Sequence, residues 1–206
     1  MVLENKLGIT DVTELARAEE RISKSKACTL MTSGVLETYK AGSLQALVAI
    51  HAYLFEDIYD FAGKIRTVNI AKGSFRFAPV MYLKTALKNI EAMPQSTFDE
   101  IIEKYVEMNI AHPFREGNGR CTRIWLDLIL KKELHQVIDW SCVDKNDYLL
   151  AMERSPVKDT EIKVVLQQAL TDKTNDIQIY MKGIDASYYY EGYAVYKTEN
   201  LRGQGF

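Results

Sequence analysis

Apolar side chains recur every three or four residues along most of the chain, which is the period of an amphipathic helix. Serine, aspartate and proline stand at several of the expected helix starts, where each of these residues is favoured. The expected helices cover residues 11–25, 43–58, 79–93, 96–111, 117–134, 144–153, 159–170, 176–182 and 187–193. No repeat or low-complexity linker divides them, so the pattern predicts an all-α fold in which residues 1–206 form a single domain.

One segment breaks the helical period. Residues 64–77 (KIRTVNIAKGSFRF) alternate apolar and polar side chains around Gly73, which predicts a β-hairpin with glycine in the turn. A lone hairpin in a helical domain has two interpretations. Either the hairpin has a structural role only, or its open edge pairs with the backbone of a partner protein.

Composition narrows the class of protein. The 206 residues are 47% hydrophobic, enough to bury a core, and carry a formal charge of −2. A near-neutral chain lacks the basic excess that captures nucleic acid or an anionic membrane, so neither is expected as a partner. No apolar run approaches the roughly 20 residues of a membrane span, and the acidic residues among the first 25 positions argue against a signal peptide.

The cysteines and the motifs that the sequence lacks indicate the compartment and exclude some kinds of binding site. Three unpatterned cysteines indicate a reducing compartment, and we expect a cytoplasmic protein. The chain has no CxxC, HExxH or GxxxxGK[ST] motif. We therefore expect neither a dedicated zinc site nor the commonest phosphate loop.

Residues 111–123 (AHPFREGNGRCTR) combine several groups that suit phosphate chemistry. A helix is expected to start at residues 117–119, where unpaired backbone N–H groups and the helix dipole favour an anion. Arg120 and Arg123 are three residues apart and therefore lie on one face of the first turns. This arrangement predicts a cradle for two or three phosphates.

Two neighbouring side chains complete the set. Glu116 can hold Mg²⁺, which usually sits between one carboxylate and phosphate oxygens, and His112 can take a proton from an incoming hydroxyl. Taken singly, a histidine at a helix end is more often a packed residue and a Gly-Asn-Gly segment is more often a turn. Two arginines three residues apart more often lie on a solvated face. Together these features form the pattern HxFx[DE]GNGRxxR, which arises by chance in a chain of this length on the order of once in 10⁸.

The pattern resembles the signature of the Fic family without a departure. Its eight positions are His112, Phe114, Glu116, Gly117, Asn118, Gly119, Arg120 and Arg123. Residues 54–66 (LFEDIYDFAGKIR) also look like the family's approach to its flap hairpin. The resemblance covers at least residues 43–155 and implies a helical bundle with a β-hairpin flap at 64–79, in agreement with the hydrophobic pattern.

Most Fic proteins transfer AMP from ATP to a Ser, Thr or Tyr hydroxyl of a target protein. The resemblance implies that His112 is the general base, that Phe114 anchors the loop, and that Glu116 holds Mg²⁺ against the α- and β-phosphates. The remaining positions bind phosphate: Gly117, Asn118 and Gly119 line the anion hole, with Arg120 on the β-phosphate and Arg123 on the γ-phosphate. Kinase-like relatives have lysine where this chain has Gly119, so the glycine favours nucleotidyl transfer.

Two further parts of the site follow from the same resemblance or from side-chain type. Lys72, Gly73, Ser74 and Phe75 are expected to form the part of the flap that docks the target by strand-like pairing. Tyr148 and Met152 are candidates for the adenine pocket, because an aromatic and a soft apolar side chain one turn apart suit a planar base. Core packing of these two residues explains the same pattern and is the commoner outcome.

Residues 187–192 (SYYYEG) fit a second family pattern, [ST]xxxE[GN]. The resemblance is to small self-inhibited Fic proteins, and it implies an inhibitory helix at about 185–193. Ser187 and Glu191 are four residues apart and face the same way, so Glu191 is expected to reach Arg123 and compete with the γ-phosphate. A short solvated helix capped by Ser187 is the simpler alternative. Tyr188 is a candidate acceptor for self-modification.

The leading hypothesis is a Mg²⁺-dependent protein adenylyltransferase that uses ATP and is restrained by its own C-terminal glutamate. Two alternatives stay open: a Fic enzyme that mainly removes AMP or uses another phosphate donor, and a catalytically silent module that docks a partner through its flap. The expected partner is a protein with an acceptor hydroxyl. Bacterial relatives modify type II topoisomerase subunits, but no residue here selects such a target, and the sequence leaves a homo-oligomer open.

Overall fold

The computed structural model describes residues 2–72 and 75–191. Helices dominate it, which confirms the predicted all-α fold class. The helices are α1 Val12–Thr32, α2 Leu44–Phe55, α3 Val80–Ala92, α4 Phe98–Ala111, α5 Asn118–Leu134, α6 Lys145–Arg154, α7 Thr160–Gln167 and α8 Ile177–Glu191. Two short 3₁₀ helices, η1 Val35–Thr38 and η2 Trp140–Cys142, lie in the connections. No helix in the described ranges is both long enough and apolar enough to span a bilayer.

Side-chain caps fix several of the predicted helix starts. Asp11 and Ser43 accept hydrogen bonds from backbone N–H groups in the first turns of α1 and α2. Thr97 and Glu100 form a reciprocal capping box at the start of α4. These caps satisfy N–H groups that have no partner within the helix. The starts predicted at residues 11 and 43 coincide with the caps, and the start predicted at residue 96 lies one residue before Thr97.

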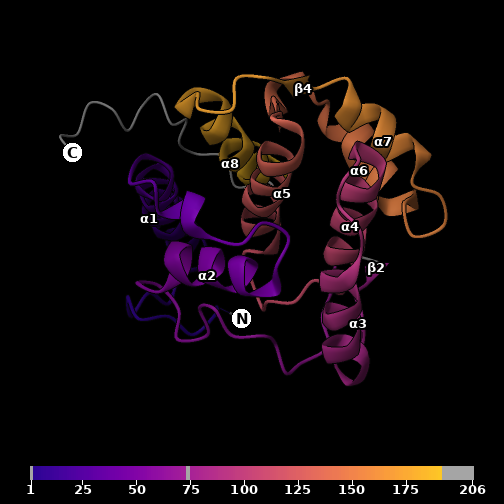
Figure 1. Cartoon of the computed structure of the whole chain (residues 1–206). Coiled ribbons are helices and arrows are strands. Elements are labelled where there is room, and N and C mark those ends of the chain that lie inside the picture. The colour runs from indigo at the N-terminus through magenta and orange to yellow at the C-terminus, as the bar shows by residue number, and fades with distance from the viewer. Residues whose placement is uncertain (1, 73–74, 192–206) are drawn as a thin grey trace.

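Helix α5 lies at the centre of the molecule, with α1 and α2 on one side of it and α3 and α4 on the other (Figure 1). It packs against α2, α4 and α8. Trp125 in its middle is fully buried and donates a hydrogen bond from Nε1 to the Ser43 carbonyl at the start of α2. The helix that carries the phosphate motif at its N-terminus is therefore anchored in the core along its length.

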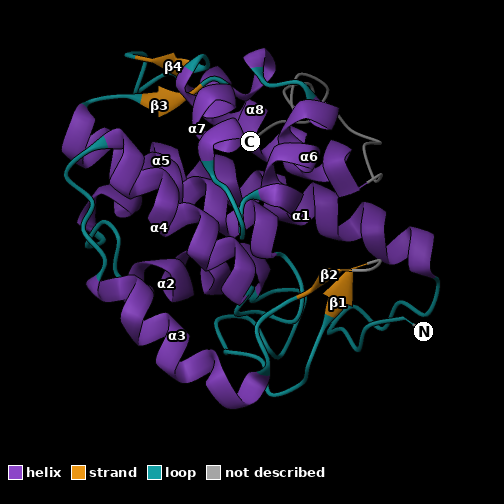
Figure 2. Ribbon diagram, turned by 90° about the vertical axis from the view of Figure 1, so that its right-hand side faces the viewer, coloured by secondary structure: helices purple, strands orange, loops and turns teal. Residues whose placement is uncertain are grey.

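The predicted hairpin exists, but its ladder is shorter than the alternating segment. Strand β1 (Ala71–Lys72) pairs antiparallel with β2 (Phe75–Arg76). The Ile70 carbonyl still accepts from the Phe77 N–H, but residues 64–69 do not join this ladder, and the backbone N–H of Arg66 is bonded to the motif loop instead. A second antiparallel pair, β3 (Val137–Ile138) with β4 (Leu170–Thr171), was not predicted and lies far from the hairpin (Figure 2).

The C-terminal part differs from the prediction in two places. The structure has one continuous helix, α8, where the sequence predicted two helices separated near Gly183. Gly183 acts as a contact point and not as a break, because a Cβ there would lie 2.9 Å from Cδ1 of Trp140. Helix α7 ends at Gln167, earlier than predicted, since Leu170 pairs with β3.

Candidate active site

His112 ends α4 in a left-handed conformation, with φ 49° and ψ 65°. This turn directs the chain from α4 into the motif loop. The Nδ1 atom lies 3.3 Å from the carbonyl oxygen of Asn109, which can only accept a hydrogen bond. The contact places the proton on Nδ1 and leaves Nε2 as the basic nitrogen, as a general base requires. The imidazole stacks on Phe77 of the flap segment at a centroid distance of 3.6 Å.

Asn118 closes the motif loop. Its Oδ1 accepts from the Phe114 N–H and its Nδ2 donates to the Phe114 carbonyl, both at 2.8 Å. The Asn118 side chain therefore holds the loop, and only its backbone N–H is placed for the predicted anion hole. Phe114 is fully buried, as expected for an anchor.

His51 on α2 supports the same loop, and the sequence analysis did not single it out. Its Nδ1 accepts from the Gly63 N–H at 2.8 Å, so Nε2 carries the proton and donates to the Glu116 carbonyl at 2.9 Å. The ring stacks on Phe114 with a centroid separation of 3.8 Å. His51 thus joins the flap approach to the motif loop. A lone histidine in an apolar helix pattern gives no signal of this role.

Helix α5 starts at the place where the sequence predicts an anion-binding helix start. Gly117 has φ 78°, and a Cβ on it would lie 2.5 Å from the Phe55 ring, so only glycine fits there. Cys121 is the first residue whose N–H bonds to a carbonyl one turn back, that of Gly117. The N–H groups of Asn118, Gly119 and Arg120 precede it at the positive end of the helix.

Arg120 lies in a buried cluster of charge. Its Nη2 is 2.9 Å from a carboxylate oxygen of Glu19 on α1 and 2.9 Å from one of Glu116. The rings of Phe55 and Tyr188 lie 5.4 and 4.6 Å from the guanidinium. In this conformation Arg120 orients Glu116, and a β-phosphate has to compete with two carboxylates to reach it.

Glu116 offers a carboxylate suited to a hard cation. Its side chain is 37% exposed, and Oε1 accepts from Arg120 and from the Gly117 N–H. Within the described residues no three His, Cys, Asp or Glu side chains gather into a metal cluster. A metal ion here would therefore take Glu116 together with phosphate oxygens, which is the donor set that Mg²⁺ commonly uses in nucleotide sites.

Arg123 is buried under α8. Its Nη1 donates to the Ser187 hydroxyl, and the rings of Trp140, Tyr190 and Tyr148 lie 4.3, 4.6 and 5.1 Å from its guanidinium. Within the described residues its Nε has no hydrogen-bond partner. Ser187, which the sequence analysis named with Glu191 in the inhibitory helix, thus contacts this part of the site. Glu191 is the last residue of α8, and its side chain lies outside the described part of the chain.

Comparisons with known proteins place this site in a family. Residues 42–130, which include the whole motif, match the model of the Fic/DOC family. The chain therefore contains a Fic/DOC family domain. It is similar to the "Probable protein adenylyltransferase Fic" of Salmonella typhimurium, with 27% identity over 188 residues that cover 83% of this chain and 88% of the relative.

Other relatives agree with this assignment. "Protein adenylyltransferase VbhT" of Bartonella schoenbuchensis is 28% identical over 84% of this chain, which spans 38% of that longer protein. The N-terminal FIC domain of Bep8 from Bartonella sp. 1-1C shares the fold, with a TM-score of 0.69, 17% identity and coverage of 84% of this chain and 92% of the other. The comparisons confirm the family resemblance and the prediction of an enzyme of this type.

The Fic flap is described only in part. Lys72 and Phe75 stand at the ends of the paired strands, whereas Gly73 and Ser74 lie outside the described residues. The Phe75 ring meets that of Phe77 edge to face, at 5.1 Å between centroids. Aromatic contacts thus run from the flap strand to the ring of His112.

The predicted adenine-pocket residues are packed in the core. Tyr148 is 5% exposed, and its hydroxyl lies 2.7 Å from that of Tyr105. Its ring lies 5.2 Å from that of Tyr190 on α8. Met152 is also buried. This is the packing that the sequence analysis gave as the alternative, and an adenine contact at Tyr148 requires Tyr190 of α8 to move.

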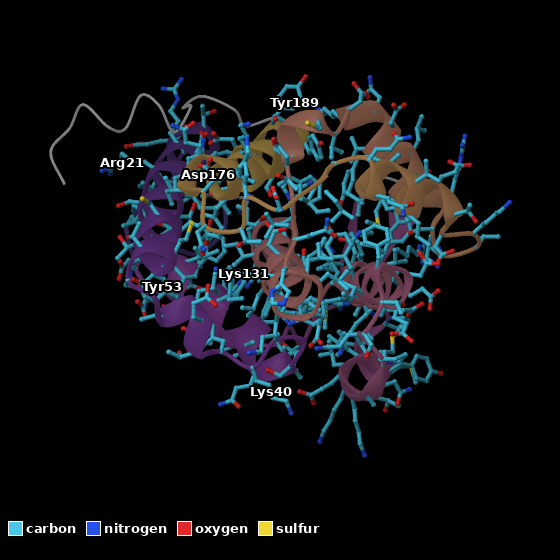
Figure 3. All side chains as sticks on the ribbon, turned by 45° about the horizontal axis from the view of Figure 1, so that its top comes forward. Arg21, Lys40, Tyr53, Lys131, Asp176 and Tyr189 are labelled. Atoms are coloured by element: carbon cyan, nitrogen blue, oxygen red, sulfur yellow. The ribbon has the colours of Figure 1, made fainter. Side chains whose placement is uncertain are left out.

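Tyr188 is 1% exposed, and its hydroxyl is hydrogen-bonded to Ser23 on α1. The Tyr188 hydroxyl is therefore buried in this conformation, and self-modification at Tyr188 stays a prediction that requires α8 to move. The spacing of tyrosines along α8 explains the burial, because Tyr188 faces α1 while its neighbour Tyr189 is 55% exposed and lies at the outer edge of the molecule (Figure 3).

His51 makes the stability of the Fic fold depend on pH. Burial lowers the pKa of His51 from 6.5 to about 4. The unfolded chain therefore binds a proton between pH 6.5 and 4 that the folded chain excludes, so stability falls as the pH decreases through this range. We expect the free energy of unfolding to drop by about 3 kcal/mol more in wild type than in His51→Gln, since each unit of pKa is about 1.4 kcal/mol.

Urea unfolding of both proteins at several pH values between 7 and 4 measures this difference. Asp127, whose pKa burial raises to about 7, titrates in the same range with the opposite sign. It is present in both proteins, so its contribution cancels in the comparison. A difference that stays constant with pH would show that His51 keeps an ordinary pKa.

Proposed function

We propose that this Fic protein transfers AMP from ATP to a Ser, Thr or Tyr hydroxyl of a target protein, and that its C-terminal helix α8 restrains the transfer. The observation that supports the transfer is the combination of a basic Nε2 on His112 with the anion-binding start of α5 one short loop away. Both positions belong to a motif without departures from the family pattern, and the named relatives are protein adenylyltransferases.

The proposed reaction is an in-line attack on the α-phosphorus of ATP. His112 takes the proton of the target hydroxyl, the new oxygen–phosphorus bond forms, and pyrophosphate leaves. Backbone N–H groups at the start of α5 and the arginine side chains hold the negative charge of the phosphates. Mg²⁺ held by Glu116 would neutralise phosphate charge when bound. The chain itself supplies mainly positioning and a proton acceptor.

The observation that supports the restraint is the burial of Arg123 under α8. Ser187 accepts its hydrogen bond and Tyr190 covers its guanidinium. A γ-phosphate therefore has to displace α8 before Arg123 can bind it. Glu191 follows Ser187 by one helical turn, and we propose that its charge repels the polyphosphate at the same arginine.

The flap is proposed to present the target segment to His112. The two-residue strand pair leaves an open edge, which can pair with an extended segment of the target. The acceptor hydroxyl would then approach the ring that Phe77 holds in place. Since the reaction consumes ATP, we propose that it takes place in the cytoplasm.

A nucleotide panel tests this function. The Glu191→Gly form is incubated with ATP, GTP, CTP or UTP and a cell lysate, and modified proteins are identified by mass spectrometry. We expect AMP on hydroxyl side chains with ATP alone. Attachment of another nucleotide would show that this nucleotide, and not ATP, is the donor. Removal of AMP from a pre-modified target, with no AMP added to unmodified proteins, would show that the enzyme is an AMP hydrolase. No nucleotide-dependent change in either assay would contradict catalysis and favour a docking module.

A further inference from the structure

We propose that Arg66 is a positioning residue that fixes the catalytic histidine and the flap as one unit. This inference rests on the proposed function, and it adds a residue outside the eight-position motif. Arg66 lies in the flap approach, before the strands, and is 5% exposed. Its guanidinium joins three segments of backbone, in the flap approach, at the end of the flap and at the end of α4.

The contacts of Arg66 are all to backbone carbonyls. Its Nε donates to the His112 carbonyl at 2.7 Å, and its Nη2 donates to Ala111 at 3.0 Å and to Ala78 at 2.5 Å. Its Nη1 donates to Val68 at 2.8 Å. Its own backbone N–H donates to the Pro113 carbonyl at 2.8 Å. A single residue thus holds both sides of the histidine turn and the end of the flap.

The charge of Arg66 suits the place where it lies. The Ala111 and His112 carbonyls belong to the C-terminal end of α4, which carries a partial negative charge and lacks intrahelical donors. No described carboxylate lies within ion-pair distance of Arg66. The helix end and the other two carbonyls therefore supply the counter-charge, and burial of the guanidinium is offset by four hydrogen bonds.

These bonds set the position of the catalytic ring. His112 has a positive φ, a conformation that residues other than glycine rarely adopt without support. A hydrogen bond on its carbonyl fixes the peptide plane and hence the direction in which the imidazole leaves the backbone. Ala78, which Arg66 also binds, follows Phe77 directly, and Phe77 stacks on that imidazole. Both partners of the stack are therefore held by the same guanidinium.

The role requires arginine. The three nitrogens of the guanidinium reach carbonyls in three different directions from one rigid plane, whereas a lysine ammonium is a single point with three donors. Among the described residues, the hydrogen bonds of Arg66 go to positions 68, 78 and 111–113 and none goes to 116–123. Arg66 therefore supports the acceptor side of the site and makes no hydrogen bond to the phosphate side.

The test is Arg66→Lys, measured in the wild-type and Glu191→Gly backgrounds. We expect kcat for AMP transfer to a protein identified with the nucleotide panel to fall roughly 10- to 100-fold, as for a catalytic group displaced by about 1 Å, and KM for that protein to rise. The Kd for ATP should stay within about twofold. Arg21→Lys is the matched control, because Arg21 is an exposed arginine on α1 (Figure 3), and it should match wild type in all three quantities.

A second readout needs no activity and separates this inference from the proposed function. In NMR spectra, the His112 ring protons should carry a ring-current shift from Phe77 that is reduced in Arg66→Lys and retained in Arg21→Lys. Phe77→Leu keeps Arg66 and should also lower kcat without changing the Kd for ATP. This variant replaces Arg66→Lys as the test if Arg66→Lys does not fold. An unchanged His112 shift in folded Arg66→Lys, a kcat within twofold of wild type, or a parallel loss of ATP binding would overturn the inference.

Discussion

Replacing His112 by alanine is expected to lower the rate of AMP transfer by roughly 10²- to 10⁴-fold, the range that a general base contributes. ATP affinity should change little, because the phosphate-binding groups belong to the start of α5 and the His112 ring stacks on the flap. The basic Nε2 that the Asn109 contact leaves on His112 is the physical reason for the effect. Single-turnover transfer and ATP titration of the same proteins measure the two quantities.

The backbone conformation of His112 makes a second substitution necessary. Its φ of 49° disfavours alanine, so a loss in His112→Ala could include distortion of the loop. Asparagine tolerates this conformation and cannot act as the base, so His112→Asn should lose transfer to the same extent. His135→Asn is the matched control, because His135 is an exposed histidine that ends α5 at φ 55°. Transfer that persists in His112→Asn would remove His112 as the base.

Replacing Glu191 by glycine is expected to raise the rate of AMP transfer roughly 10- to 100-fold. Two unit charges about 4 Å apart interact by about 4 kcal/mol at an effective dielectric of 20, and partial screening of this repulsion leaves one or two factors of ten in rate. The measurement is the initial rate of label transfer from ATP labelled at the α-phosphate. Glu153→Gly, at an exposed position in the last turn of α6, should leave the rate unchanged.

Two other variants test the same restraint without removing a charge. Ser187→Ala deletes the hydroxyl that accepts from Arg123. Gly183→Ala places a methyl group 2.9 Å from the Trp140 ring and so loosens the contact between α8 and η2. Each should raise the rate and lower the KM for ATP. Wild-type rates in these variants and in Glu191→Gly would show that α8 is a structural helix with no restraining role.

The sequence alone was sufficient for the parts of this protein that local chemistry determines. Helical periodicity and the caps Asp11 and Ser43 predict where two of the helices begin. The motif, together with glycine in the turn before α5, predicts an anion-binding helix start. Each of these features involves residues a few positions apart, so a linear pattern contains the information.

The supporting residues could not be predicted, because their partners lie far away in the chain. His51 binds the Glu116 carbonyl and Arg66 binds the His112 carbonyl, and backbone carbonyls leave no mark on a sequence pattern. The same reason applies to Glu19, whose contact with Arg120 brings α1 into the site. The two-helix prediction failed at Gly183, since only the packed structure shows that glycine admits a tryptophan there.

The most direct test of the central claim compares two forms of labelled ATP. The Glu191→Gly enzyme is incubated with a cell lysate and ATP labelled at either the α- or the γ-phosphate, and His112→Asn in the same background is the negative control. The account predicts protein-bound label from α-labelled ATP alone, and none with His112→Asn. Protein-bound label from γ-labelled ATP that depends on the enzyme, or no enzyme-dependent label from either form, would contradict adenylyl transfer.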